Sequence, residues 1–361
     1  MNLPPVVPYA AEDSKTPPPS RLVSLDAFRG FTMFWLMGGK AFFLALAALG
    51  VPFLRYQLTH SDWEGLRYYD LIWPSFMLMV GVSIPFSFAR RLATQTRGRL
   101  MRQVWRRAIV LFLLGSLRES MSANAPMWIE LSSALQPIAL AYVVASYLAG
   151  RAVRLQIGVA AGILVVYALI LPAGSYQMNQ NFVTAVDKLV VGRAHPEGWG
   201  TVLSAIPAIS TTILGLLFGQ VLLSARSHRE KMRIFGLTGL GCLAAGRALS
   251  PVVPVIMKLW TTSYGLMSAG WACLLFLSFY WIVDVRQYRK WAYPLVVIGT
   301  NAIAAYLGPS IVSTRRIAEI FSKPVAQQMG VWGPLLSAAV LLLVNWSILN
   351  WMHKRKVFLK V

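Results

Sequence analysis

The chain has 361 residues, of which 57% are hydrophobic and 13% are charged. Soluble domains usually carry about 25% charged residues, so this composition excludes a soluble globular protein and predicts an integral membrane protein. The net charge of +21 does not indicate a nucleic-acid partner, because the basic residues are spread through connectors between apolar segments and form no single stripe with interleaved aromatic residues.

The first twenty residues are rich in proline and have too short an apolar run for a signal peptide. They predict a disordered cytoplasmic tail at 1–20. Short charged connectors, rather than a separate polar module, interrupt the apolar segments that follow. The sequence therefore predicts one transmembrane domain at 21–361.

Apolar runs recur that are long enough to cross a hydrocarbon core of about 30 Å. They predict an all-α bundle of about ten transmembrane helices. The expected spans are 27–49, 68–89, 105–118, 131–149, 155–172, 201–224, 234–249, 262–284, 292–308 and 332–352.

The basic residues predict how this bundle is oriented. With a cytoplasmic N-terminus, 22 of the 34 Lys and Arg residues fall in inside connectors and nine in outside connectors, while Arg29, Lys40 and Arg247 lie within or at the ends of spans. This bias follows the positive-inside rule and predicts that both termini are cytoplasmic. The two long outer connectors, 173–200 and 309–331, are then the expected place for sorting an extracytoplasmic substrate.

The start of the first span contains a charged pair and three glycines. Asp26 and Arg29 lie three residues apart, so they share one face of a helix and form either an ion pair at the headgroup level or part of a functional mouth. Gly30, Gly38 and Gly39 allow another backbone or a ligand to approach closely.

The connector before the second span gathers a histidine and three carboxylates. His60 exchanges protons near neutral pH and suits a general base, and the alternative is an interfacial histidine that is hydrogen-bonded to a neighbour. Asp70 lies where a carboxylate favours a helix N-terminus. Asp62 and Glu64 are expected to be solvated. Trp63 serves either as an interfacial anchor or as a platform for a sugar.

Three further residues lie inside apolar segments. Asn301 is expected either to hold helices together or to line a pocket. Cys242 and Cys273 are expected to pack in the core, and their apolar surroundings argue against a disulfide or a thiolate metal site. No two of the four histidines are close enough along the chain to indicate a metal site.

Several of these motifs, in this order and spacing, resemble the heparan-alpha-glucosaminide N-acetyltransferase family, and especially its bacterial branch labelled as domain of unknown function DUF5009. The resemblance extends over most of residues 21–310. The segments that carry it are RLVSLDAFRG, HSDWEGLRYYDLIWPSFMLMVGVSIPFS, LQPIALAY (135–142), HPEGWGTVLSAIPAISTTILGLLFG (195–219), KLWTTSYGLMSAGWA (258–272), FYWIVDV (279–285) and IGTNAIAAYLG (298–308).

The resemblance implies transfer of an acetyl group across a membrane, from cytosolic acetyl-CoA to an amino-sugar or glycan on the far side. His60 matches the family's histidine in the outer connector, with Asp70 as a nearby polar support. Asp26 and Arg29 would belong to the inner mouth, and Arg106 and Arg107 would bind the CoA phosphates. Either His60 takes a proton from the acceptor during direct transfer, or it first carries the acetyl group as an acyl-imidazole.

The sequence departs from the family pattern at three positions. Lys40 stands where the family has an asparagine after the first motif. Around Gln136, which is a candidate CoA ligand, Pro137 and Glu130 occupy places where arginines are usual. An ammonium group within the first span is expected to seek a carboxylate, either Asp70 or Glu130.

Two functional hypotheses follow. The first is an acyltransferase of a bacterial inner membrane that uses acetyl-CoA and no metal and acts on an extracytoplasmic glycan or amino-sugar. A monomer and a homo-oligomer are both compatible with this hypothesis. Its expected catalytic residues are His60 and Asp70, and Lys40, Trp63 and Asn301 are expected to contact the acceptor. The second is a carrier or accessory subunit that kept the fold and lost CoA binding.

Overall fold

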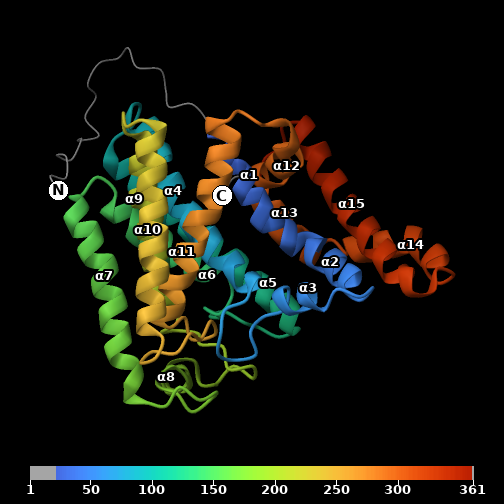
Figure 1. The fold of residues 1–361 in the computed structure, drawn as a ribbon, viewed down its shortest axis with the longest axis horizontal. Coiled ribbons are helices and arrows are strands. Elements are labelled where there is room, and N and C mark those ends of the chain that lie inside the picture. Colours follow the sequence, from blue (N-terminus) through green and yellow to red (C-terminus); the bar gives the residue numbers. More distant parts are fainter. Residues whose placement is uncertain (1–21, 360–361) are drawn as a thin grey trace. The chain divides into compact units, whose positions relative to one another are not determined.

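The computed structural model describes residues 22–359, so the tail predicted at 1–20 lies outside the described residues. The described chain is helical, and its one recorded β-bridge joins Glu64 to Ile256. The longer helices, shown in Figure 1, are α1 (Val23–Phe34), α2 (Lys40–Ala47), α4 (Ile72–Leu92), α5 (Arg97–Ala123), α6 (Leu135–Leu148), α7 (Val153–Ile170), α8 (Phe182–Val191), α9 (Ala205–Leu223), α10 (His228–Leu249), α11 (Thr262–Phe279), α12 (Tyr293–Thr300), α13 (Ala302–Ile311), α14 (Thr314–Ala326) and α15 (Gly333–Lys354).

Each of the ten predicted spans falls on one or more of these helices. Within residues 22–359, six helical segments are long and apolar enough to cross a membrane: Val23–Ala47, Tyr68–Leu92, Val153–Ala173, Ala205–Leu223, Thr262–Val285 and Gly330–Lys354. The helices Lys290–Thr300 and Ala302–Ile311 are bent by 61° and form a seventh segment if they are counted together. The protein is therefore a multi-pass membrane protein, and the number of ten crossings and the orientation stay predictions.

The described residues form two compact units. Unit 1 comprises residues 62–66 and 73–274, and unit 2 comprises residues 22–61, 67–72 and 275–359. Helix α4 begins in unit 2 and continues in unit 1, whereas α11 begins in unit 1 and ends in unit 2. The single domain predicted for 21–361 thus contains two groups of packed helices, and its unity stays a prediction.

Unit 1 is built on helices that run alongside one another, among them α7, α9 and α10 (Figure 1). Its core includes Phe88 from α4, Val104 from α5 and Ile213 from α9, all fully or nearly fully buried. Helices α4 and α9 approach closely, because a Cβ at Gly215 would overlap with the carbonyl group of Leu78. Small residues allow such approaches between helices in a membrane.

Unit 2 is organised around the pair α1 and α12. A Cβ at Gly30 would overlap with the carbonyl oxygen of Leu295, so the two backbones meet at a position that only glycine permits. Sequence reasoning expected this close approach from the glycines of the first span. The contact between Gly30 and Leu295 fixes the position of the segment of α1 that carries Asp26 and Arg29.

The first span is not a regular helix. Residues Trp35–Gly39 form a π-helical turn, and Gly38 has φ of 139°, a value that favours glycine. The carbonyl oxygen of Met37, inside this turn, accepts a hydrogen bond of 2.6 Å from Asn345 Nδ2 of α15. A π-helical turn contains one more residue than an α-helical turn, so the residues after it are rotated about the helix axis. Lys40 is the first residue after this turn.

Candidate functional site

Asp70 is held at the start of the second span by its own backbone. Residues Tyr68–Leu71 form a 3-10 turn, η2, that precedes α4. Arg67 N donates a hydrogen bond of 2.9 Å to Asp70 Oδ2, and Asp70 N donates one of 3.1 Å to Arg67 O. The Asp70 side chain thus caps the backbone N–H of Arg67, which is one half of a capping box. The carboxylate is completely buried, with 0% exposure, so its orientation is set by the fold.

His60 completes a histidine–carboxylate pair with Asp70. Its Nδ1 lies 2.7 Å from Asp70 Oδ1, and Ser61 N approaches Asp70 Oδ2 at 3.4 Å. Because an ionised carboxylate only accepts hydrogen bonds, we assign the tautomer that has the proton on Nδ1 and the lone pair on Nε2. The His60 side chain is 34% exposed, and a substrate can therefore reach it.

Arg67 fixes the main chain of the connector that carries His60. Its Nη1 donates to His60 O at 2.6 Å and to Thr59 Oγ1 at 2.9 Å. Its guanidinium carbon lies 4.4 Å from the ring centroid of Tyr56, in a cation–π contact. Sequence reasoning missed this residue, although its position three places before Asp70 is the spacing of a helix cap.

Lys40 reaches the same cluster through an aromatic ring. Its Nζ lies 4.0 Å from the ring centroid of Tyr69, and the ring of Tyr69 lies 4.8 Å from that of His60 at an interplanar angle of 61°. The negative charge of Asp70 attracts the ammonium group. Lys40 thus lies near one of its two predicted partners, Asp70, and its recorded close contact is with Tyr69.

Asp26 and Arg29 form the predicted pair on α1, with 3.5 Å between Arg29 Nη1 and Asp26 Oδ1. A second carboxylate, Asp284, caps the same helix, because its Oδ2 accepts from Ser24 N at 3.2 Å. Arg289 Nη2 lies 3.9 Å from Asp284 Oδ1, so these two side chains form an ion pair. These groups gather two arginines and two carboxylates at the start of α1.

Asn301 lies at the break between α12 and α13. Its Nδ2 donates to Val357 O at 3.0 Å, and its Oδ1 accepts from Leu359 N at 3.1 Å. Both ends of the amide therefore hold the C-terminal segment, and the residue is 1% exposed. This arrangement corresponds to the structural alternative for Asn301.

Two of the remaining candidates belong to unit 1, where their polar atoms have internal partners. Trp63 Nε1 donates to Tyr176 O at 2.8 Å. Gln136 is fully buried: its Nε2 donates to Ser116 Oγ at 2.9 Å and to Trp128 O at 3.0 Å. Both hydrogens of the Gln136 amide are used within the protein, so the residue has no donor left for a CoA group.

The arginines of α5 are placed differently from Gln136. Arg107 is half-buried, its guanidinium carbon lies 5.0 Å from the ring centroid of Tyr142, and its buried Nε has no hydrogen-bond partner among the described residues. Arg106 is exposed and shares one face of the helix with Arg99 and Arg102. Such a row of guanidinium groups can pair with phosphate groups.

Unit 1 contains another buried carboxylate, Glu130, which the sequence marks as a departure from the family pattern and as one of the two expected partners of Lys40. Glu130 is 3% exposed and pairs with Arg193. Its Oε1 accepts from Ser132 Oγ at 2.5 Å and from Thr201 Oγ1 at 3.4 Å, and its backbone N donates to Gln136 Oε1 at 2.8 Å. These contacts join the connector after α5 to the connector after α8.

Asp187, on α8, is a third buried carboxylate and is 1% exposed. Its two oxygens accept from Thr201 N and Val202 N, each at 2.8 Å. Burial raises the pKa of the Asp187 carboxyl above its ordinary value. The backbone donors of Val202 and Thr201 oppose this rise, and the nearby charge of Glu130 adds to it.

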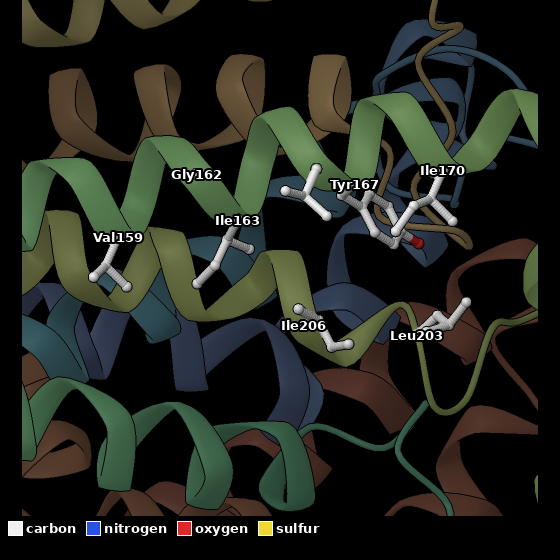
Figure 2. A pocket seen from close by; sticks show the side chains of 8 residues that line it. Val159, Gly162, Ile163, Tyr167, Ile170, Leu203 and Ile206 are labelled. Carbon is white, nitrogen blue, oxygen red and sulfur yellow. The ribbon is translucent and has the colours of Figure 1, made fainter.

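Unit 1 also has an apolar groove of about 360 Å³ between α7 and α9, which is shown in Figure 2. Its wall includes Val159, Ile163 and Ile206, and the hydroxyl group of Tyr167 donates to Leu259 O at 2.6 Å. The groove therefore offers neither a charged group nor a nucleophile. Within residues 22–359, no group of three or more His, Cys, Asp or Glu side chains is placed to hold a metal.

These features define a multi-pass helical membrane protein with one partly exposed histidine that is hydrogen-bonded to a buried aspartate. The chain is similar to human heparan-alpha-glucosaminide N-acetyltransferase, with 23% identity over 371 aligned residues. The match covers 81% of this chain and 53% of the human protein, so the chain spans about half the length of that relative. No protein-family model matches the chain. The relationship is distant.

Proposed function

We propose that the protein is a membrane acetyltransferase that moves an acetyl group from cytosolic acetyl-CoA to an amino-sugar or glycan on the other side of the membrane. The observation that carries the proposal is the hydrogen bond of 2.7 Å between His60 Nδ1 and Asp70 Oδ1, together with the 34% exposure of the His60 side chain. The distant similarity to an N-acetyltransferase supports the reaction class. The resemblance to the bacterial DUF5009 branch supports an inner-membrane location.

In direct transfer, His60 acts as the general base. Nε2 takes a proton from the acceptor amine while the amine nitrogen attacks the thioester carbonyl carbon. A C–N bond forms, the C–S bond breaks, and the CoA sulfur leaves with the electron pair and receives the proton from the imidazolium. Asp70 keeps Nδ1 as the donor and stabilises the charged ring, in the manner of the third member of a catalytic triad.

The two-step route uses the same atoms in another order. The Nε2 lone pair attacks the thioester, the CoA thiolate leaves, and the acyl-imidazole then passes its acetyl group to the acceptor. We favour direct transfer because it needs no second activated group. In both routes the hydrogen bond to Asp70 sets which ring nitrogen reacts.

The residues of α5 support binding of CoA. Arg106, with Arg99 and Arg102 on the same exposed face, supplies guanidinium groups that pair with phosphates in bidentate geometry. Arg107 contributes a buried Nε that has no hydrogen-bond partner among residues 22–359. Gln136 does not fit this role, because its amide hydrogens are donated to Ser116 and Trp128.

The test is turnover of labelled acetyl-CoA by the full chain in membrane vesicles, with and without amino-sugars. The unsubstituted chain, His60→Ala and a matched control, His228→Ala, are compared; His228 is an exposed histidine in the first turn of α10. We expect turnover that depends on the acceptor and is lost only in His60→Ala. Equal turnover in all three chains would remove His60 from the mechanism. Absence of CoA binding would favour the carrier or accessory subunit.

A further inference from the structure

Helix α14 differs from the loop that the sequence predicts at 309–331, because it has three distinct faces. Thr314, Ala318 and Ser322 repeat every four residues, are at most 4% exposed, and lie on the face that packs on α15. Figure 1 shows α14 beside α15. A Cβ at Gly333 would overlap with the carbonyl oxygen of Ala326, so the end of α14 is in backbone contact with the start of α15.

The second face of α14 is apolar and uncovered. Ile320 and Phe321 are 72% and 70% exposed, and Ile317 and Val325 are 38% and 52% exposed. The spacing of these residues, i, i+3, i+4 and i+8, places them on one stripe beside the buried face. An apolar stripe of this kind marks a surface that contacts another apolar phase or partner.

The third face is charged. Arg315, Arg316, Glu319 and Lys323 are all exposed, and their formal charges give three positive against one negative. Glu319 is paired with Arg315 at 3.1 Å, four residues apart. An apolar face with a basic face opposite to it is the pattern of a helix that lies in the plane of a membrane surface.

The neighbouring helix determines which surface this is. The segment Gly330–Lys354, which contains α15, is long and apolar enough to cross a membrane, and it begins four residues after Ala326. The edge of the bilayer must therefore lie within a few residues of the end of α14. Trp332, which is 53% exposed at the start of this segment, is a residue type typical of that edge.

We propose that α14 is an interfacial helix whose apolar stripe enters the boundary between headgroups and acyl chains, and whose arginines and lysine contact anionic phospholipid headgroups. The charged face excludes a position inside the hydrocarbon core, because four charged side chains would lose their hydration there. In this position, α14 anchors the N-terminal end of α15 at the membrane surface. This proposal is independent of acetyl transfer.

The test uses spin labels on the full chain in vesicles of equal parts phosphatidylcholine and phosphatidylglycerol. Cys242 and Cys273 are replaced by Ala, and single cysteines are introduced at Ile320, Phe321, Glu319 or Lys323, with Leu343 on α15 as the lipid-facing reference. All these positions are exposed, so a label there displaces no core residue. Melting curves establish that each labelled chain is folded.

We expect the ratio of collision rates with oxygen and with a nickel chelate to be several-fold higher at positions 320 and 321 than at 319 and 323, and close to that at 343. Equal nickel-chelate accessibility on both faces would overturn the proposal, because it describes a solvated helix. Protection of positions 320 and 321 from both reagents would also overturn it, because a protein partner, such as a second copy of the chain, would then cover the stripe.

Discussion

Two buried carboxylates of this protein, Asp70 and Glu130, have partners of different kinds. Asp70 faces an imidazole that is one-third exposed, whereas Glu130 faces the guanidinium of Arg193 and is surrounded by hydroxyl and amide groups. An imidazole exchanges protons near neutral pH and a guanidinium does not. We therefore propose that the carboxylate of Asp70 supports the reaction, whereas that of Glu130 holds together the connectors of unit 1.

The largest expected effect comes from the imidazole itself. His60→Ala removes the proposed base, so we expect acetyl transfer per folded molecule to fall by about 10²- to 10⁴-fold, the range for loss of general-base catalysis. Thermal unfolding should shift to a lower temperature, because the variant removes a hydrogen-bond donor from the fully buried carboxylate of Asp70, so rates are compared per folded molecule. Initial rates with labelled acetyl-CoA measure the loss, and His228→Ala is the control. Full activity in His60→Ala would remove the proposed functional difference between the cluster around Asp70 and the cluster around Glu130.

Asp70→Asn tests whether the carboxylate acts through the ring. The Asn amide can donate to Nδ1, which would move the ring proton to Nε2 and leave no base there, so we expect a loss of about 10²-fold or more in kcat. A lower kcat supports the role of Asp70 only if the variant is folded, because the Asp70 carboxylate also accepts a hydrogen bond from Arg67 N. A melting curve and acetyl-CoA binding therefore accompany the assay. Unchanged kcat with retained fold contradicts the assigned role of Asp70.

Arg67→Met should have an intermediate effect, because Arg67 positions His60 without reacting. The change removes the donors to His60 O and Thr59 Oγ1, and a displaced catalytic group lowers kcat by roughly 10-fold or more. Arg67→Lys restores one donor and should recover part of the rate. A matched control is Arg55→Met, on the short helix α3 (Pro52–Gln57) of the same unit. Equal kcat in all three variants would show that the connector is held without Arg67.

The sequence predicts the helical class, the positions of the candidate spans and the candidates His60 and Asp70. These predictions rest on apolar length and on residue type, which are local properties. The hydrogen bond between His60 and Asp70 depends on how the nine intervening residues fold back, and no periodicity encodes that path. Gln136 illustrates the limit, because its partners are Ser116 on α5 and Trp128 in the connector after α5, and no sequence pattern predicts the conformation of that connector.

Helix α14 was also not predicted from the sequence, for a different reason. Ile317, Ile320 and Phe321 follow helical spacing, with charged residues between them, so a period of 3.6 residues was present within the predicted connector. Apolar length does not reveal this helix, because the stretch is short and contains charged residues. Amphipathic spacing, rather than apolar length, is the signal that finds such a helix.

Glu130→Gln tests whether Glu130 stabilises the fold without taking part in acetyl transfer. The substitution removes the charge opposite Arg193 while keeping the shape, so we expect the free energy of unfolding to fall by roughly 1–3 kcal/mol. The loss stays in this range because the Arg193 side chain is 39% exposed, so water can solvate its charge. Acetyl transfer per folded molecule should be unchanged. A loss of kcat with unchanged stability would place Glu130 in the reaction and remove the contrast with Asp70.

Asp187→Asn should give the smallest effect, visible as a change in pH dependence. Burial raises the pKa of Asp187 in the folded state above its ordinary value near 3.8, so the folded state binds the proton more tightly than the unfolded state does. The stability that this proton contributes is present at low pH and is lost as the pH rises through the raised pKa. Asp187→Asn keeps a neutral side chain at every pH, so its melting temperature should decline less between acidic and neutral pH than that of the unsubstituted protein. Parallel melting curves for the two proteins would mean that the hydrogen bonds from Thr201 N and Val202 N compensate fully for the burial of the charge.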